Sequence, residues 1–196
     1  AKEYGVANVA VVEKGWLGGG NVARNTTIIR SNYLSPESAF LYDKAMELWL
    51  GLSRELNYNV MFSPRGLINL AHSREGLVEL RRRVRALNLN GIESSMISPE
   101  EIAKKVPILD CSPTAPNPVL GGSWQAKAGI ARHDAVAWGY ARGADTRGVD
   151  LIQNCEVTGI RREGGRVTGV ETARGTIRAK KVAIVTAGHS GVDPAY

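Results

Sequence analysis

The segment VAVVEKGWLGGG (residues 9–20) joins a continuous apolar run to an acidic residue and then to a series of glycines. An apolar run of this kind indicates a β-strand that is buried on both faces, as in a parallel sheet. A carboxylate that is buried there without a partner would cost several kcal/mol. We therefore expect Glu13 either in a solvent-exposed turn or in contact with a group that carries hydroxyls.

The rest of the sequence predicts a mixed α/β fold. Ser35, Ser73 and Ser98 are expected to cap three helices, and Glu101 completes a capping box with Ser98. A fourth helix is expected over 133–147. Strands are expected at 66–72, 121–126 and 182–188. A parallel strand is expected near 149–155, followed by an antiparallel excursion around a Gly164–Gly165 turn. The first helix is expected to turn one apolar stripe toward the core: Phe40, Leu41, Ala45, Leu48, Trp49 and Leu52.

Composition narrows the class of protein. Of 196 residues, 43% are hydrophobic and 22% charged, which are ordinary globular values. The net charge is +6, but the basic residues are scattered, and the densest run, RRRVR at 81–85, is typical of a solvated helix face rather than a nucleic-acid site. Cys111 and Cys155 form no CxxC pair, so neither a metal site nor a disulfide framework is indicated. No targeting segment or long apolar run is evident, and we expect a cytoplasmic protein. Both ends of the sequence indicate a fragment of a larger protein.

Glu13 has a position known from nucleotide-binding folds. In a doubly wound sheet, the second strand ends in an acid whose carboxylate accepts hydrogen bonds from ribose hydroxyls. The phosphate-binding GxGxxG turn would lie about twenty residues before this acid. Gly18–Gly20 follow the second strand, so they are not that turn. An exposed strand end explains Glu13 equally well, and both interpretations stay open on the residues alone.

Five segments together are more specific: VVEKGWLGGGNVARNTTIIRSNY, GLINLAH, SWQAKAGIARHDAVAWGYAR, GVDLIQNCEVTGI and VAIVTAGHS. In this order they resemble the glycine oxidase/D-amino acid oxidase superfamily of flavoproteins, and within it the heterotetrameric members that oxidise sarcosine. The resemblance implies an FAD-binding doubly wound (Rossmann-like, glutathione-reductase-type) sheet with an antiparallel excursion, plus part of an α+β substrate domain. The implied boundaries are 1–34 and 129–196 for the FAD-binding domain and 35–128 for the substrate domain.

The resemblance assigns FAD contacts to several positions. Glu13 matches the ribose-binding acid, and the flexible backbone of Gly18–Gly20 would let the chain approach a bulky cofactor. Val157 matches the strand beside the adenine, although the residue alone would indicate core packing. The segment along the isoalloxazine and the ribityl-pyrophosphate arm is matched by Asn21, Thr26 and Ile28. The small-residue turn after the last strand is matched by Ala187 and Gly188. FAD would be held non-covalently, because the monomeric relatives attach it to a cysteine outside this sequence.

Two further residues carry the expected chemistry. Arg30 matches the arginine that binds the substrate carboxylate in monomeric relatives, a role that suits the planar guanidinium; a structural ion pair is the alternative. Thr27 departs from those relatives, which have another arginine there. His133 matches the histidine to which a second flavin, FMN, is covalently bound, and a helix N-terminus would keep the imidazole neutral and nucleophilic. Asp134 is expected to favour the helix dipole rather than act as a base. His72 is expected to be structural, whereas His189 could touch the cofactor, and no metal is expected.

The implied reaction is oxidation of sarcosine to glycine and a one-carbon unit. Electrons would pass from FAD through FMN to oxygen and give hydrogen peroxide, with tetrahydrofolate as a further partner of the heterotetramer. Alternatives are a related dehydrogenase subunit of the dimethylglycine or hydroxyproline type, or a flavin electron-transfer module without a substrate site. The scattered charge argues against a nucleic-acid-binding protein.

Overall fold

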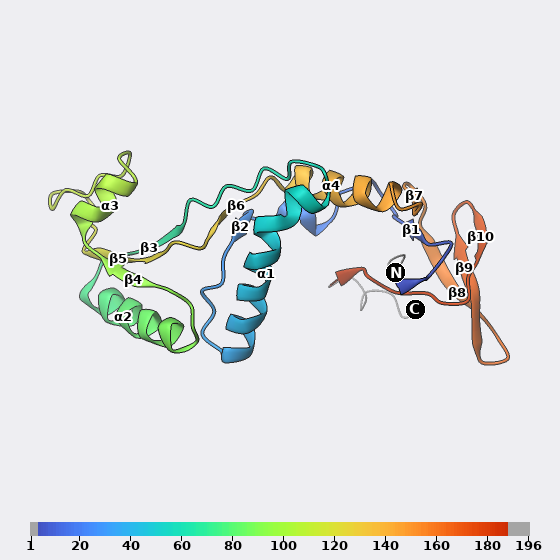
Figure 1. Ribbon diagram of the computed structural model, residues 1–196, viewed down its shortest axis with the longest axis horizontal. Helices are drawn as coiled ribbons and strands as arrows, with labels where there is room; N and C mark the ends of the chain where they lie inside the picture. Colours follow the sequence, from blue (N-terminus) through green and yellow to red (C-terminus); the bar gives the residue numbers. More distant parts are fainter. Residues whose placement is uncertain (1–3, 188–196) are drawn as a thin grey trace. The chain divides into compact units, whose positions relative to one another are not determined.

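The computed structural model describes residues 4–187, and these belong to two compact units. Unit 1 combines the segment that ends at Asn25 with the segment that begins at Ala137, and unit 2 is Thr26–Val136 (Figure 1). The sequence places its boundaries nearby, at 34/35 and 128/129. The assignment of the segments to an FAD-binding and a substrate domain stays a prediction. Each unit is described by itself.

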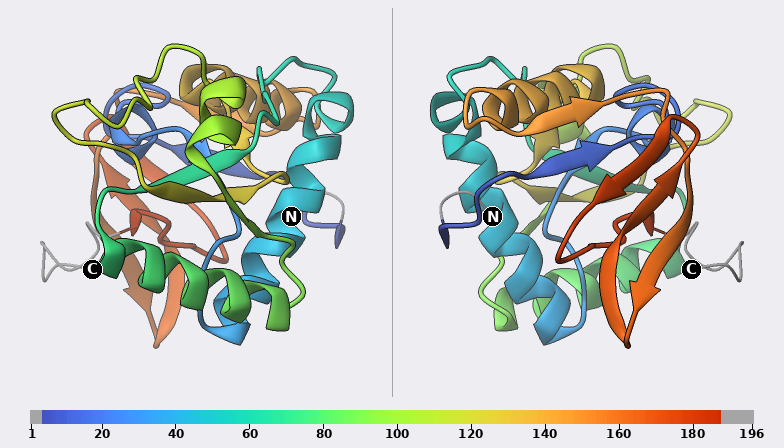
Figure 2. Two further views of the ribbon diagram at one scale, coloured as in Figure 1. Left: turned by 90° about the vertical axis from the view of Figure 1, so that its left-hand side faces the viewer. Right: turned by 90° about the vertical axis from the view of Figure 1, so that its right-hand side faces the viewer.

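Unit 1 contains a parallel strand pair and an antiparallel three-stranded sheet. Strand β1 (Ala10–Val12) pairs in parallel with β7 (Asp150–Ile152), as Figure 2 shows in its right-hand view. The antiparallel sheet has the strand order β10-β9-β8. The strands of this sheet are β8 Val157–Glu163, β9 Arg166–Thr172 and β10 Gly175–Arg178. Unit 1 also contains a short 3-10 helix, η2 (Asn21–Arg24), which follows the glycine run. These elements confirm the predicted parallel strand and antiparallel excursion.

The turn between β8 and β9 is the predicted Gly164–Gly165 pair. Both residues have positive φ angles, 57° and 76°. A two-residue hairpin turn with left-handed backbone at both positions is favoured because its twist matches that of the strands, and glycine adopts it without steric cost.

The apolar segment after β10 was predicted to be a strand, and for its described residues this was wrong. No strand is formed at 180–186, and Val185 is 82% exposed. β-branched residues favour an extended backbone, but a strand also needs a neighbour that accepts and donates its hydrogen bonds. Within residues 4–187, no strand pairs with this segment.

Unit 2 is built around a second antiparallel sheet with the strand order β3-β5-β4. Its central strand is β5 (Gly121–Gln125), and adjacent glycines of β5 turn to opposite faces of the sheet. A Cβ at Gly121 would meet Leu77 of helix α2, and one at Gly122 would meet Ile102 of helix α3. The two helices therefore cover opposite faces of this sheet, as both views of Figures 1 and 2 show. The outer strands are β3 Leu67–Ala71 and β4 Ser95–Ile97.

The helices begin where the sequence predicts. The Ser35 and Ser73 hydroxyls accept hydrogen bonds from backbone amides of the first turns of α1 and α2. At α3, Ser98 and Glu101 form both hydrogen bonds of the capping box, at 3.3 and 2.7 Å. The helices have these bounds: α1 Pro36–Glu55, α2 Arg74–Leu89, α3 Pro99–Lys105 and α4 His133–Asp145. Among the described residues, none of the helices is long and apolar enough to cross a membrane.

The predicted core face of α1 is wrong in part. The helix buries Ala39, Met46 and Leu52, whereas three members of the predicted stripe are exposed: Phe40 by 76%, Leu41 by 64% and Leu48 by 61%. Ala39 packs with Leu87 and Ile92, which fixes the face that the helix turns inward. The helix is apolar on more than one side, so the period alone did not select this face.

Candidate cofactor and substrate site

Glu13 lies directly after β1, at the carboxyl end of the parallel pair. Its backbone N–H donates to the Ile152 carbonyl at 2.8 Å, and its own carbonyl accepts from the Cys155 N–H at 2.9 Å. Its side chain is exposed, and Oε1 accepts a hydrogen bond from the Gly15 N–H at 2.8 Å. An ionised carboxylate has about four acceptor positions, so Glu13 keeps acceptors for further donors.

Hydrogen bonds connect the loop after β1 to the loop after β7. The Leu17 N–H donates to Gln153 Oε1 at 2.6 Å, and the Asn154 N–H donates to the Gly15 carbonyl at 2.7 Å. Lys14 forms an ion pair of 2.6 Å with Glu156, the residue before Val157. Glu13 and Val157 therefore flank one junction between β1, β7 and β8, and Val157 is half-buried in β8.

The glycine run leaves free space at one position. A Cβ at Gly19 would come within 2.9 Å of the Trp16 indole, whereas a Cβ at Gly20 would meet nothing within 4 Å. Asn21, at the start of η2, and Thr26 are exposed. Ala187 has a φ of 52°, a left-handed conformation that favours glycine and small side chains. Gly188 and His189 lie outside the described residues.

In unit 2, two short strands that the sequence did not predict join the Arg30 and His133 segments. Strand β2 (Ile28–Ile29) pairs with β6 (Gly129–Ile130), with Ile28 opposite Ile130. The Ala131 N–H also donates to the Thr27 carbonyl at 3.1 Å. Arg30 follows β2 and His133 follows β6, and because the pair is antiparallel the two residues lie beyond its opposite ends. Two-residue strands carry no periodic signal, which is why sequence patterns missed them.

Arg30 is half-buried and held by an aromatic pair. Its guanidinium carbon lies 5.5 Å from the Tyr33 ring centroid, within cation–π range. The Tyr33 ring stacks on Tyr42 of α1, with centroids 3.9 Å apart. The Tyr33 hydroxyl raises the pKa of Tyr42 through a hydrogen bond and its charge, and the Arg30 charge opposes this shift. Within residues 4–187 no carboxylate lies within ion-pair distance of Arg30, so the alternative of a structural ion pair has no support there.

A buried polar contact follows directly on Arg30. Ser31 is fully buried, and its hydroxyl accepts a hydrogen bond of 2.6 Å from Gln125 Nε2 at the end of β5. Asn32 is also buried, and its Oδ1 and Gln125 Oε1 have no hydrogen-bond partner in the described part of the chain. The contact ties the Arg30 segment to the central sheet of unit 2.

His133 is the first residue of α4 and is half-buried. The two residues beside it form a bidentate ion pair, in which Arg132 donates to the Asp134 carboxylate at 3.0 and 2.6 Å. This hydrogen bonding, with the Ala135 N–H as a second donor, lowers the pKa of Asp134 from 3.8 to about 2. Asp134 is therefore ionised at neutral pH and too weak a base for proton abstraction, and its charge lies in the first turn of α4.

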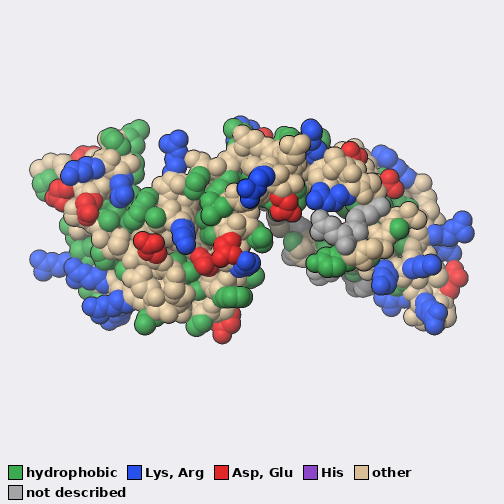
Figure 3. All heavy atoms as spheres, viewed as in Figure 1, with side chains coloured by type: hydrophobic (Ala, Val, Ile, Leu, Met, Phe, Trp, Pro, Cys, Tyr) green, Lys and Arg blue, Asp and Glu red, His purple; other side chains and the backbone are tan. Residues whose placement is uncertain are grey.

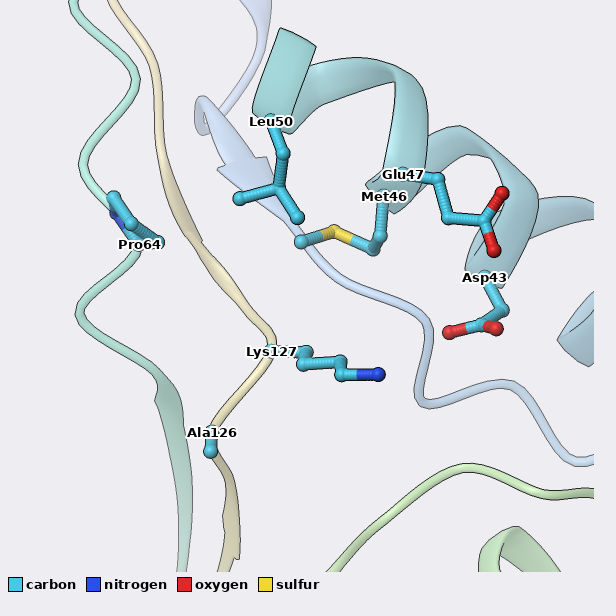
Figure 4. Close-up of a pocket in the computed structure, with 7 residues that line it drawn as sticks. All are labelled: Asp43, Met46, Glu47, Leu50, Pro64, Ala126 and Lys127. Atoms are coloured by element: carbon cyan, nitrogen blue, oxygen red, sulfur yellow. The ribbon is translucent and has the colours of Figure 1, made fainter.

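A pocket that sequence reasoning missed lies beside α1 (Figure 4). It encloses about 200 Å³ between the apolar side chains of Met46 and Leu50 on α1 and a wall formed by Pro64 and Ala126. Lys127 points toward the side of α1 that carries Asp43 and Glu47. Glu47 pairs with Lys44 at 2.5 Å, which lowers the pKa of Glu47, and Lys127 adds to this effect. The signal in the sequence was the i,i+4 spacing of the two acids. None of the residues assigned from the sequence lines this pocket.

The remaining predicted residues are structural. His72 follows β3, and its Nδ1 lies 3.1 Å from the Asn117 carbonyl. Cys111 and Cys155 are free thiols, and Cys155 is buried. In the part of the chain that the structure describes, no group of three or more His, Cys, Asp or Glu side chains could hold a metal ion.

These features agree with the family to which the sequence belongs. The family model for FAD dependent oxidoreductases matches residues 1–194, and the chain is a member of that family. Among its relatives, sarcosine oxidase subunit beta from Rhodobacter capsulatus is 59% identical over 192 residues, which are 97% of this chain and 46% of that protein. The subunit of the same name from an Arthrobacter species is 54% identical and matches 98% of this chain and 47% of its own length. The chain thus spans about half the length of these relatives.

Solved structures support the same fold. L-proline dehydrogenase from P. horikoshii superimposes with a TM-score of 0.80 and 28% identity, covering 91% of this chain and 46% of that one. Glycine oxidase from Bacillus cereus also reaches 0.80, at 20% identity, over 92% of this chain and 48% of its own. The mixed α/β fold is therefore that of FAD-dependent oxidoreductases.

The residues at the end of β1 fit the ribose portion of FAD. Glu13 offers free acceptors to hydroxyl groups, and the open position at Gly20 lets another molecule approach the backbone. At α4, His133 is the half-buried first residue of the helix.

Proposed function

We propose that this chain is part of a flavoenzyme subunit that oxidises sarcosine to glycine and a one-carbon unit. The observation that carries the proposal is the half-buried guanidinium of Arg30, which lies against the Tyr33 ring and has no ion pair within residues 4–187. When bound, FAD supplies an acceptor for the substrate's electron pair, and FMN would pass electrons on to oxygen, giving hydrogen peroxide. The similarity to sarcosine oxidase subunit beta supports this choice of substrate.

In this proposal FAD is held non-covalently on a doubly wound sheet to which β1 and β7 belong. Glu13 accepts hydrogen bonds from the ribose, and Val157 lies along the adenine. The isoalloxazine and the pyrophosphate arm would contact Asn21, Thr26, Ile28 and Ala187. Arg30 binds the substrate carboxylate as a bidentate pair, and the Tyr33 ring keeps its guanidinium in one orientation.

The Arg30 assignment is tested in the full-length, FAD-loaded protein. Arg30→Lys keeps the charge but loses the planar fork, so the apparent KM for sarcosine should rise about tenfold or more. The FAD content should not change. Arg54→Lys, in the exposed last turn of α1, is the matched control and should leave KM unaltered. An unchanged KM in Arg30→Lys would assign a structural role to this residue.

His133 is proposed as the covalent attachment point of FMN. After denaturation and acid precipitation of the assembled protein, flavin should remain with this subunit, and its mass should exceed that of the unmodified chain by one FMN. His133→Ala should abolish this adduct and leave FAD bound, whereas His72→Ala should keep it. A His133→Ala variant that retains covalent flavin refutes the assignment.

The full protein is proposed to work in the cytoplasm as one subunit of a heterotetramer, with oxygen and tetrahydrofolate as further partners. Two weaker similarities keep alternatives open: dimethylglycine dehydrogenase from rat at 24% identity, and the pyruvate dehydrogenase phosphatase regulatory subunit from mouse at 26%. One alternative is a related dehydrogenase subunit of the dimethylglycine or hydroxyproline type, and the other is a flavin electron-transfer module without a substrate site. Anaerobic flavin reduction by sarcosine, dimethylglycine and hydroxyproline separates them, because the proposal requires sarcosine to react fastest.

A further inference from the structure

The solvent-facing side of α2 carries a row of arginines. Positions 74, 78, 81, 82, 85 and 89 fall on one face of a helix, because their spacings combine three and four residues. Four of them are basic and two aliphatic: Arg74, Arg81, Arg82 and Arg85, with Val78 and Leu89. All six are exposed, and Figure 3 shows Lys and Arg side chains gathered over α2. We call these six residues the α2 face.

The opposite side of α2 is anchored. Leu80, Val84 and Leu87 are buried, and the Ser73 hydroxyl caps the first turn. The α2 face is therefore presented by a fixed helix and not by a loop. A fixed surface costs less conformational entropy when another molecule binds to it.

Within the described residues, the arginines of the α2 face form no ion pairs. Arg83, on the flank, pairs with Glu79 at 3.2 Å. Among residues 4–187, Arg81, Arg82 and Arg85 have no such ion pair. Arg81 and Arg85 lie four residues apart, where like charges repel each other and destabilise a helix. A partner that carries carboxylates would relieve this repulsion.

The aliphatic residues distinguish between kinds of partner. Leu89 is 89% exposed and Val78 45% exposed, and Arg85, Asn88 and Leu89 line a shallow groove at the end of the helix. A phosphate backbone would contact the arginines but would gain nothing from these side chains, and the face has no aromatic ring on which bases could stack. Protein interfaces combine arginine with a desolvated apolar centre.

We infer that the α2 face docks an acidic surface of another subunit, one with carboxylates around a small apolar centre that covers Leu89. This inference rests on the proposed function, which makes the full protein a subunit of an assembly. Carboxylates opposite Arg81, Arg82 and Arg85 would speed and orient association, and Leu89 would fill an apolar site within that charged ring.

The test uses the full-length protein and the purified partner subunits of its own assembly. The triple variant Arg81→Glu/Arg82→Glu/Arg85→Glu reverses the charge of the face. The control Arg162→Glu/Arg166→Glu/Arg178→Glu makes the same change in charge at exposed positions of the antiparallel sheet of unit 1. Association is measured by sedimentation at 50 and 300 mM salt, and thermal melting checks that both variants are folded.

We expect the dissociation constant to rise about a hundredfold in the α2 variant and less than threefold in the control. Binding by the parent protein should weaken with salt, whereas the α2 variant should lose most of this dependence. Leu89→Ser should weaken association about tenfold and keep the salt dependence. If the α2 variant does not fold, Leu89→Ser and the salt dependence still decide the question.

Normal assembly of the α2 variant, or equal weakening in the control, overturns the inference. The inference also fails if a 20-base-pair DNA duplex binds the parent protein but not the α2 variant while assembly is unchanged. Sarcosine-dependent flavin reduction is measured on the same samples. Flavin reduction in the parent protein together with normal assembly of the α2 variant refutes only the α2 face, whereas absence of reduction in the parent protein refutes the proposed function.

Discussion

Gly129→Ala should disrupt the close approach of β6 to the backbone of Ser63 and Pro64. A Cβ at Gly129 would lie 2.1 Å from the Ser63 carbonyl oxygen and 2.8 Å from Pro64 Cα. A Cβ essentially never lies within 3.0 Å of such an atom, so the two segments must separate by about 1 Å. Ser63 and Ile130 exchange backbone hydrogen bonds of 2.7 and 3.1 Å, and this separation would break both.

The cost follows from these contacts. Two lost backbone hydrogen bonds contribute about 1 kcal/mol each. Forcing a methyl group into a packed site adds about 1–3 kcal/mol. The free energy of unfolding should therefore fall by about 3–5 kcal/mol, measured by urea denaturation of the full-length protein. Hydrogen exchange at the Ile130 amide gives a local readout and should become much faster.

The matched control is Gly159→Ala in β8, where a Cβ would meet nothing within 4 Å. Restricting the unfolded backbone at such an open position makes the control neutral or slightly stabilising. Should Gly129→Ala be as stable as Gly159→Ala, with Ile130 exchange unchanged, the close approach of β6 to Ser63 would be wrong.

Two further predictions concern single side chains. Glu13→Gln keeps the shape but loses the charge that strengthens hydrogen bonds to ribose, so FAD affinity of the full-length protein should fall by about 1–3 kcal/mol in a titration; unaltered affinity would contradict the ribose assignment. Because the folded-state pKa of Asp134 is lowered from 3.8 to about 2, its ion pair with Arg132 stabilises the fold fully above about pH 4 and is lost as the pH falls toward 2. The stability difference between the parent protein and Asp134→Asn should therefore shrink over this range in urea denaturation, and a difference that stays constant would rule out the ion pair.

Features that depend on neighbouring residues were readable from the sequence. The caps at Ser35, Ser73 and Ser98 are examples, because the capping hydroxyl and the amide that it accepts from are three residues apart. The Gly164–Gly165 turn is another, since left-handed backbone at two consecutive positions selects glycine. Such signals need no knowledge of tertiary contacts.

Features that depend on distant partners were not readable. Strand β2 exists because Gly129–Ile130 lies beside it, and the two segments are far apart in the chain. The apolar residues 182–185 have high strand propensity, yet no described neighbour pairs with them. On α1, the neighbouring residues Ala39 and Phe40 cannot both face the core. Ala39 is buried against Leu87, and Phe40 is exposed.

The candidate site likewise combines features that the sequence predicts with features that depend on distant residues. The position of Glu13 after an apolar strand was visible in the sequence, and the structure puts it at the end of a parallel pair. The aromatic support of Arg30 was not visible, because Tyr42 comes from a helix nine residues beyond Tyr33. Nor was the pocket beside α1, whose wall comes from Pro64 and Ala126.

The pairing of β1 with β7 has a consequence for biosynthesis. Ala10 pairs with Asp150, and all of unit 2 lies between these strands in the chain. At about 5–20 residues per second, a ribosome needs on the order of ten seconds to synthesise the intervening segment. During that time the edge of β1 that later pairs with β7 has no partner there, while the local contacts of unit 2 can already form. We expect chaperones to cover this edge of the nascent chain until β7 is made.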